Sequence, residues 1–457
     1  MYHAATMTRA TNTIRLFAIL ILASFAIGCS SSGSDKSKSA TSKNTFDVRR
    51  HGAVGDGTSD DTRAFQDALT LCAERGGGEV AVPAGNYLIG SVVMGSKTTL
   101  RFEQGAKITG KPLAEAYPLR KIRWEGRWRE GHQALIHAEN ARDIAIVGPG
   151  VINGATPMGY LRRPRGPCII EFIECSGVRL DSFSINYERM WAVHPTFCSD
   201  VTIKGLTIRS KRPNGDGIDV DSCKDVRITA CDIDAGDDAI ALKSGRGQEA
   251  VAIASPTENV YIADCKLGSD FAGLAIGTEM SGGVRNVKFE RCTFTRGSNS
   301  IFIKSRIGRG GFIQNIEGRD LEAKASAFLR IDLLTKGIQD EQPVEGVAGI
   351  PVARNLRFEN VTASVPFLVD GALVPPEKPL DGLSLINIKG TARKGIELAN
   401  MRNVELREID VKVEQPPLLR ISNVTGTGIE GASPLPPRRP ATTRSAASTA
   451  PAGAAQP

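Results

Sequence analysis

An eight-residue pattern recurs from residue 178 onward and constrains the fold more than any other feature: apolar, any, apolar, any, any, apolar, any, apolar. The clear copies share this spacing and are Val178-Leu180-Phe183-Ile185, Val201-Ile203-Leu206-Ile208, Val226-Ile228-Cys231-Ile233, Val260-Ile262-Cys265-Leu267 and Val287-Phe289-Cys292-Phe294. Weaker copies begin at Ile316, Leu356, Leu383 and Val404. Successive copies start 23, 25, 34, 27, 29, 40, 27 and 21 residues apart.

Alternation with period two inside each half of a copy predicts a strand with one buried face, and the break in phase between the halves predicts a bend. A period that varies from 21 to 40 residues fits coils whose strands keep their length while their turns grow loops. A β-sandwich also alternates, but it does not keep one template at coil-length spacing over more than 200 residues. The repeat therefore predicts an all-β chain folded as a parallel β-helix. Forty-eight glycines and 5% aromatic residues also argue against a helical bundle.

Six cysteines fall at two fixed positions of this repeat. Cys231, Cys265 and Cys292 share one inward position, and Cys175, Cys198 and Cys223 each lie three residues before the start of a copy. Equivalent positions of stacked coils lie about 4.8 Å apart. Because parallel side chains on stacked strands suit a ladder better than a bridge, we expect free thiols, although an exported protein permits disulfides.

The start of the stack has a different pattern. Residues Asp60 to Arg75 predict a helix with Phe65, Ala68, Leu69 and Cys72 on one face, ended by Gly76-Gly77-Gly78. Residues 79–85 then predict a first strand and turn. An amphipathic helix at this point would cover the open N-terminal end of the apolar core.

The N-terminus has the features of an export signal. Arg9 and Arg15 precede an apolar run from Leu16 to Ile27, which is too short to span a bilayer and suits a signal-peptide core. Small residues before Cys29, followed by a serine-rich stretch, resemble a bacterial lipoprotein signal with lipidation at Cys29. The alternative is an ordinary cleaved signal with an incidental cysteine. Either reading predicts export, and the first predicts a lipid-anchored protein of the bacterial cell envelope, in the outer membrane or periplasm.

Composition divides the chain into four segments: a signal peptide (1–29), a flexible tether (30–45), a β-helix catalytic domain (46–431) and a disordered tail (432–457) rich in Pro, Ala, Thr, Ser and Arg. The formal charge of +7 comes entirely from the ends, since 1–46 holds five Lys/Arg against Asp35 and 432–457 holds three Arg and no acid. The folded body is neutral overall, so charge gives no reason to expect a nucleic-acid partner. We expect a monomer.

Polar residues replace the repeat at one place in neighbouring coils. The segment 216–221 aligns with 238–243, 272–277 and 299–304, which puts Asp216 and Asp238 in one row with Asp237 beside it. Stacked carboxylates repel, so at least one has a raised pKa unless a cation or hydrogen bonds relieve it. One protonated and one ionised carboxyl are what acid–base hydrolysis of a glycoside requires. Both Asp237 and Asp238 reach a cleft only if the backbone bends at Gly236.

Other readings of these aspartates stay open on spacing alone. Asp is an ordinary turn residue, and paired Asp at coil spacing also suits a Ca²⁺ site.

Three central segments resemble glycoside hydrolase family 28, the polygalacturonases and their relatives: Pro213-Asn214-Gly215-Asp216-Gly217-Ile218-Asp219, Gly236-Asp237-Asp238-Ala239-Ile240-Ala241-Leu242-Lys243-Ser244 and Gly277-Thr278-Glu279-Met280-Ser281-Gly282-Gly283. The segments 52–57 and 148–154 are similar to the family's other motifs, with Asn153 where Asp is more usual. The resemblance covers about residues 46–430. It implies a right-handed parallel β-helix and hydrolysis with inversion, with Asp237 as general acid and Asp216 and Asp238 holding and deprotonating the attacking water. It implies no cofactor and no metal.

Two departures put the substrate in doubt. Where typical polygalacturonases have His in a Gly-His-Gly segment, this chain has Phe271 or Ala272, and Phe302-Ile303-Lys304 stands in place of Arg-Ile-Lys. The family's Arg and Lys are expected to grip a galacturonate carboxylate, so Lys304 is retained as a binding residue while Phe302 offers an apolar platform for a less charged sugar. Pectic polysaccharide of galacturonan type and of rhamnogalacturonan type remain equal candidates for the substrate.

Several further residues have both a functional and a structural interpretation. Asn214 is a candidate substrate-binding residue, Glu279 binds a sugar hydroxyl or orients a loop, and His194 lines the cleft or is structural. Lys243 is expected to pair with Asp221. Trp124 and Trp128 either stack on sugars or pack their loop, and the inserts near 109–137, 334–351 and 364–381 would wall the cleft.

Two rival functions remain beside the inverting hydrolase. One is a Ca²⁺-dependent polysaccharide lyase with a Lys or Arg base, and the other is a non-catalytic surface protein that binds glycans.

Overall fold

The structure is a computed structural model that describes residues 44–154, 164–186, 190–336 and 340–436. The segments predicted as signal peptide, with Cys29, and as most of the C-terminal tail lie outside these residues. Strands run from β1, which begins at Thr45, to β34, which ends at Pro434. None of the helices in the described part is long and apolar enough to cross a membrane.

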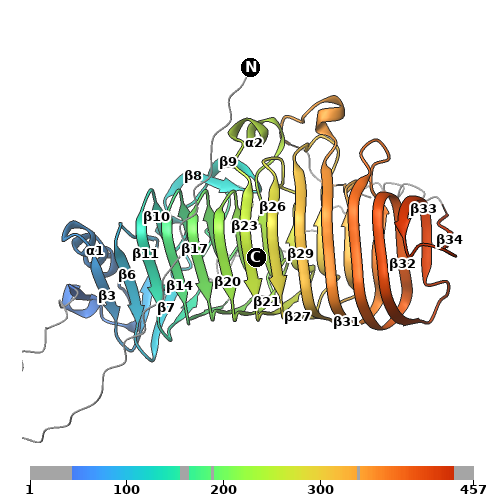
Figure 1. The fold of residues 1–457 in the computed structure, drawn as a ribbon. Coiled ribbons are helices and arrows are strands. Elements are labelled where there is room, and N and C mark those ends of the chain that lie inside the picture. Colours follow the sequence, from blue (N-terminus) through green and yellow to red (C-terminus); the bar gives the residue numbers. More distant parts are fainter. Residues whose placement is uncertain (1–43, 155–163, 187–189, 337–339, 437–457) are drawn as a thin grey trace, which may run out of the picture. The chain divides into compact units, whose positions relative to one another are not determined.

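The chain forms a right-handed parallel β-helix, as expected. Coils follow one another in sequence order from β3 near one end to β33 at the other (Figure 1). Each complete coil contributes strands to three parallel stacks.

The first stack contains β1 (Thr45–Asp47), β3 (Gly78–Val82), β6 (Thr98–Phe102), β11 (Arg142–Val147), β14 (Ser176–Asp181), β17 (Ser199–Lys204), β20 (Lys224–Thr229), β23 (Thr257–Ala263) and β26 (Val284–Glu290). The second contains β2 (Asp56–Asp60), β4 (Gly85–Ile89), β7 (Ala106–Gly110), β12 (Val151–Asn153), β15 (Ser184–Asn186), β18 (Thr207–Arg209), β21 (Asp232–Ala235), β24 (Lys266–Ser269) and β27 (Thr293–Arg296). The third contains β5 (Val92–Val93), β10 (Ile136–Glu139), β13 (Ile170–Ile173), β16 (Val193–Thr196), β19 (Ile218–Asp221), β22 (Ile240–Lys243), β25 (Ala272–Ile276), β28 (Asn299–Lys304) and β30 (Ala327–Asp332).

Longer strands that turn corners continue these stacks toward the C-terminus: β29 (Phe312–Ala323), β31 (Val352–Leu373), β32 (Leu380–Val413), β33 (Leu419–Thr427) and β34 (Ser433–Pro434). Helices are few in the described residues: α1 (Thr62–Glu74), α2 (Gly247–Ile253) and the short 3₁₀ segments η1 (Val48–His51), η2 (Ala114–Ala116) and η4 (Gly346–Gly349).

The register confirms the repeat. Val178 pairs with Val201, Val201 with Val226, Val226 with Val260 and Val260 with Val287, so the starts of the clear copies stack on one another. In the first copy the two halves lie on β14 and β15, and the bend between them includes Ser182 in a left-handed conformation. The apolar positions of all copies contribute to one continuous buried core.

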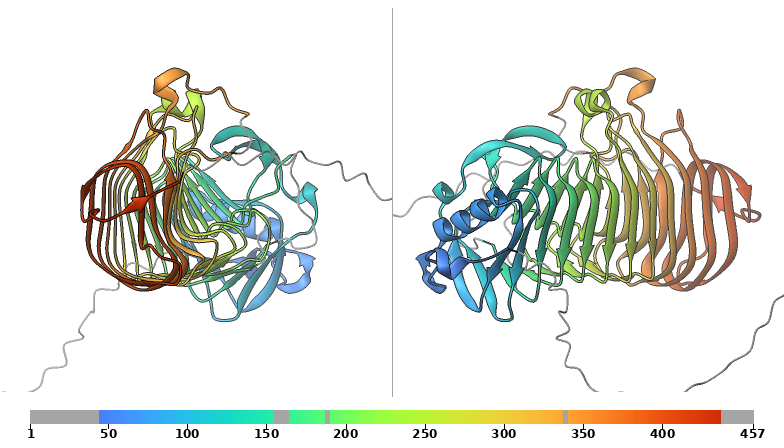
Figure 2. Two further views of the ribbon diagram at one scale, coloured as in Figure 1. Left: turned by 90° about the vertical axis from the view of Figure 1, so that its right-hand side faces the viewer. Right: turned by 60° about the vertical axis from the view of Figure 1, so that its left-hand side comes forward.

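The capping helix is also confirmed. Helix α1 spans Thr62–Glu74, and the expected face of Phe65, Ala68, Leu69 and Cys72 is buried. Figure 2 shows α1 at the N-terminal end of the stack.

Three segments project from one edge of the β-helix above the third stack (Figures 1 and 2). They are the antiparallel hairpin β8 (Leu119–Trp124) and β9 (Arg127–His132), helix α2, and the loop that carries η4. The hairpin and the η4 loop are joined by Arg129, whose Nη2 lies 2.5 Å from Asp340 Oδ2.

Candidate active site

The third stack brings the two coil-spaced aspartates side by side. Strand β19 pairs with β22 in a register that joins Ile218 to Ile240, and the amide of Gly217 donates to the carbonyl of Asp238 at 2.9 Å. Asp216 and Asp238 therefore occupy equivalent places in adjacent coils, as the sequence alignment predicts.

The expected bend at Gly236 is present. Strand β21 ends at Ala235, β22 begins at Ile240, and the amides of Gly236 and Asp237 both approach the carbonyl of Gly215. A side chain at position 236 would place its Cβ 2.1 Å from the carbonyl oxygen of Arg212, so only glycine fits this turn. The bend leaves Asp237 half-buried and Asp238 buried.

Two lysines neutralise part of this acidic group. Lys304 Nζ donates to Asp238 Oδ2 at 2.9 Å. Lys243 Nζ lies 3.3 Å from Asp216 Oδ2 and 2.5 Å from Asp219 Oδ1. A buried cation beside a carboxylate favours its ionised form and so opposes the effect of burial.

The expected pairing of Lys243 with Asp221 is wrong. Asp221 instead accepts from Arg123 of the β8–β9 hairpin at 3.2 Å, and both side chains are buried. Lys243 reaches toward Asp216 and Asp219 and lies 3.7 Å from the ring centroid of Trp191. Sequence reasoning also missed Asp219 as a site residue, although its place in the Asp216-Gly217-Ile218-Asp219 motif was a usable signal.

The carboxyls differ in electrostatic environment. Burial, reinforced by repulsion from Asp216 and Asp238, raises the pKa of Asp237 to about 8. Burial also raises the pKa of Asp238, while the adjacent Lys304 opposes that rise. Burial and repulsion from Asp216 hold the pKa of Asp219 well above its usual value. Asp237 is thus the half-buried carboxyl of this group that is protonated at neutral pH.

Glu279 extends the charged network away from the aspartates. Burial raises its pKa, but Lys243 and Arg246 outweigh that effect and keep the pKa below its usual value. Glu279 Oε1 lies 3.6 Å from Arg246 Nη2 and 4.0 Å from Lys243 Nζ. These contacts make Glu279 an ionised partner of two buried cations.

Asn214 precedes Asp216 by two residues and is half-buried, whereas His194 lies on the preceding coil and is buried. Arg165 Nη2 donates to Asn214 Oδ1 at 3.0 Å, two residues before Asp216. His194 is fully buried on β16, with Nδ1 3.2 Å from Glu171 and Nε2 3.0 Å from Thr196. It lies behind Trp191, edge to face, with ring centroids 4.8 Å apart. His194 is therefore enclosed by protein groups, which favours its structural interpretation.

Phe302 is less exposed than a sugar platform requires. Its side chain is only 4% exposed, packed with Ala241, Ala272 and Ala275. Phe271, at the place expected for the family's His, lies on it with ring centroids 5.6 Å apart and is 37% exposed. The accessible aromatic surface belongs to Phe271.

The tryptophans pack their hairpin. Trp128 stacks on Phe197 with ring centroids 6.0 Å apart. Trp124 packs against the small buried cluster that contains Trp191. These contacts favour the structural interpretation of both side chains.

One group in the described residues has the donor set of a metal site. Cys168, Glu171 and His194 place ligand atoms within 4.8 Å of one another, all buried. Both ring nitrogens of His194 already have partners, and burial raises the pKa of the Cys168 thiol well above its usual range. Asp216 and Asp238 for their part are each next to a lysine ammonium, an environment that disfavours Ca²⁺.

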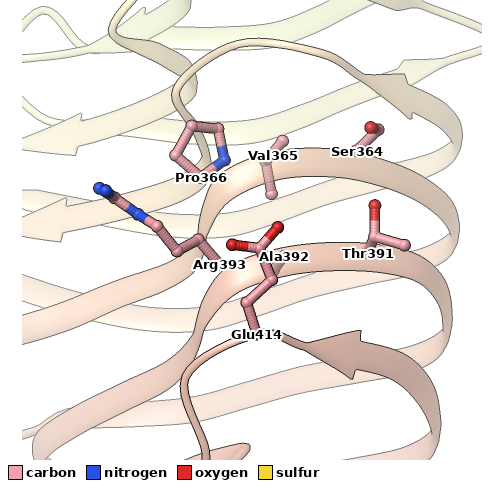
Figure 3. Close-up of a pocket in the computed structure, with 7 residues that line it drawn as sticks. All are labelled: Ser364, Val365, Pro366, Thr391, Ala392, Arg393 and Glu414. Carbon is pink, nitrogen blue, oxygen red and sulfur yellow. The ribbon is translucent and has the colours of Figure 1, made fainter.

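A surface hollow of about 440 Å³ lies elsewhere, on β31, β32 and the segment after β32 (Figure 3). Ser364, Val365, Pro366, Thr391, Ala392, Arg393 and Glu414 line it. These residues lie in coils C-terminal to the aspartates, so the hollow is separate from the acidic group.

An acidic group in which Asp237 has a raised pKa and lies beside Asp216 and Asp238 can donate a proton to a leaving group and activate water. Together with the parallel β-helix, it defines a glycosidase, an enzyme that hydrolyses O-glycosyl bonds. The model of the glycosyl hydrolases family 28 matches residues 72–405. The chain belongs to this family.

Individual relatives agree with this assignment. A probable polygalacturonase of Vitis vinifera is 30% identical over 355 residues, which cover 74% of this chain and 72% of the relative. Two solved structures share the fold. An exopolygalacturonase from Thermotoga maritima is 24% identical with a TM-score of 0.65, covering 84% of this chain and 92% of the other. The family 28 exopolygalacturonase of Yersinia enterocolitica is 19% identical with a TM-score of 0.70, covering 84% and 78%.

Proposed function

We propose that the protein hydrolyses glycosidic bonds of pectic polysaccharide with inversion, with Asp237 as the general acid. The observation that carries this assignment is the pKa of Asp237, raised to about 8 by burial and by repulsion from Asp216 and Asp238. A carboxyl that keeps its proton at neutral pH can protonate the glycosidic oxygen as the bond breaks.

Asp216 and Asp238 activate the attacking water in this proposal. They lie in adjacent coils, each next to a lysine ammonium. A water between them can lose its proton to one carboxylate while it attacks the anomeric carbon from the face opposite the leaving group, which inverts the configuration. Lys304, Asn214 and Glu279 are proposed to bind the sugar, whereas His194 and Phe302 are proposed to act through packing.

The substrate class rests on the curated relatives, which are named as polygalacturonases. The cation next to Asp238 and the exposed ring of Phe271 suit a sugar chain with carboxylates. Galacturonan is therefore the favoured polymer, and rhamnogalacturonan is the second to test.

The decisive experiment compares product release by the wild type and Asp237→Asn on polygalacturonate and rhamnogalacturonan. Loss of the general acid is expected to lower kcat by about 10²- to 10⁴-fold with little change in KM. Asp232→Asn, on the neighbouring strand β21, is the matched control and should keep full activity. Saturated products identify a hydrolase, whereas unsaturated products that require Ca²⁺ would identify a lyase.

We also propose export and lipid attachment at Cys29, on the strength of the sequence motif alone. Metabolic labelling with a radioactive fatty acid should mark the wild type and leave Cys29→Ser unlabelled. Equal labelling of both proteins would contradict this.

A further inference from the structure

A guanidinium occupies the place next to Phe302 in the following coil. Strands β28 and β30 pair in a register that puts Phe302 beside Arg330. The Cζ of Arg330 lies 5.1 Å from the centroid of the Phe302 ring. Because stacked positions are about 4.8 Å apart, the cation is displaced by one coil from the position that Phe302 occupies.

Arg330 is held in place yet remains accessible. Its Nη2 donates to Asp332 Oδ2 at 3.2 Å, and Asp332 also accepts from the amide of Leu334. The Arg330 side chain is nevertheless 37% exposed, whereas Asp332 is buried. Its Nε donates to no group among the described residues. Asp332 therefore fixes the guanidinium from one side, and because the Nε atom is itself buried, another partner would meet the exposed remainder of the side chain.

The rings of Phe302 and Phe271, which are in contact, lie between Arg330 and Lys304. Lys304 Nζ lies 5.4 Å from the Phe302 centroid and 4.7 Å from that of Phe271, while it bonds to Asp238. Lys304 is thus already engaged by a carboxylate of the protein. Arg330 is the more exposed of the two cations, with the half-exposed ring of Phe271 nearby.

We propose that Arg330 binds the carboxylate of an acidic sugar unit on the C-terminal side of Asp238, three strands further along the third stack, with Phe271 as an apolar surface for a sugar ring. The planar guanidinium fork matches a carboxylate, and a neutral sugar offers it no comparable partner. Arg330 is therefore a specificity residue that selects uronate units over neutral ones. This inference rests on the proposed function and deepens it by naming the residue that recognises the substrate's charge.

The test measures KM and kcat of the wild type, Arg330→Gln and Arg330→Lys on two substrates. One is an oligogalacturonate, and the other is the same oligomer with its carboxyls reduced to alcohols. Arg330→Gln should raise KM for the acidic oligomer by about 10- to 100-fold, the range for a lost charge-assisted hydrogen bond, and change kcat little. KM for the reduced oligomer should stay the same, and Arg330→Lys should restore part of the loss.

Arg357→Gln is the matched control. Arg357 donates to Glu359 two residues later at 3.0 Å and is 41% exposed, but it lies on β31 in register with Glu317 of the first stack. It should behave as the wild type on both oligomers.

Different failures point to different errors. Two results would overturn the role of Arg330 alone, provided that the wild type cleaves the acidic oligomer. In the first, the KM of Arg330→Gln stays within twofold of the wild type; in the second, KM rises by the same factor on both oligomers. Cleavage of only the reduced oligomer overturns it as well and leaves the hydrolase intact. If the wild type cleaves rhamnogalacturonan but neither oligomer, the role of Arg330 is wrong and the hydrolase stands. If it cleaves none of the three and Asp237→Asn binds none of them by calorimetry, both proposals are wrong.

Discussion

At the scale of single residues, the site depends on different environments around chemically identical side chains. Asp237 and Asp238 are neighbours in sequence, yet only Asp238 accepts a hydrogen bond from Lys304. Asp237 faces repulsion from two carboxylates and partial burial. In the proposed mechanism the same residue type thus supplies both a proton donor and a proton acceptor.

This arrangement predicts a bell-shaped dependence of kcat/KM on pH. Activity requires protonated Asp237, so it should fall as the pH rises through about 8. It also requires ionised Asp238, whose pKa is raised by burial, so the acidic limb should lie above the usual range of an aspartate. Rates of reducing-end release across pH 3–10 measure both limbs.

Lys304→Met should move the whole profile to higher pH. Lys304 lowers the pKa of both Asp237 and Asp238, so its removal should raise both. Lys288→Met is the control, because Lys288 is an exposed lysine 3.9 Å from Glu317 on the first stack. An unshifted alkaline limb in Lys304→Met would show that a group other than Asp237 is the acid.

At the scale of elements, asparagines stabilise one corner of successive coils. Asn355 donates to Asn315, Asn315 to Asn286 and Asn286 to Asn259, at 2.9 to 3.1 Å. All four have a positive φ near 56° and come one residue before a copy of the repeat. Asparagine tolerates this conformation and bonds across coils, so it both turns the chain and links neighbouring coils.

Asn315→Ala should destabilise the β-helix by about 1–3 kcal/mol, from a strained backbone and two lost hydrogen bonds. Asn315→Gly keeps the backbone freedom and should cost less. Chemical denaturation followed by circular dichroism gives both values. Equal stability of the wild type and the alanine variant would mean that this ladder contributes nothing.

Elements were predictable to different extents. The repeat predicted the strands and their register because alternation and stacking act on the same apolar positions. The partners of Lys243 were not predictable, since they depend on a hairpin 120 residues earlier that supplies Arg123 to Asp221. The exposure of Phe302 depends likewise on Phe271 and on alanines from other coils. Contacts that depend on loops or on the direction of a side chain leave no periodic pattern in the sequence.

At the scale of the whole molecule, the core is one uninterrupted column that shields its thiols. All eight cysteines of the described residues are free and buried, which agrees with the expected ladders. The amide of Cys198 donates to Cys223 Sγ of the next coil at 3.2 Å.

A thiol reagent should therefore detect none of these eight groups in the native protein and all eight after denaturation without reductant. All eight are buried, so the folded protein keeps the reagent away from them. Cys29 is replaced by Ser in this measurement so that it does not add to the count. Fewer than eight groups after denaturation would reveal a disulfide.

The pairing of Phe302 with Arg330 has a consequence for how such proteins diverge. Neighbouring coils present nearly equivalent sites to a ligand that lies along the axis, so a functional side chain can migrate by one coil and still meet the same chemical group. In a linear alignment this event looks like the loss of an essential residue. When such chains are compared, charged residues on one face should therefore be matched across neighbouring coils as well as at aligned positions.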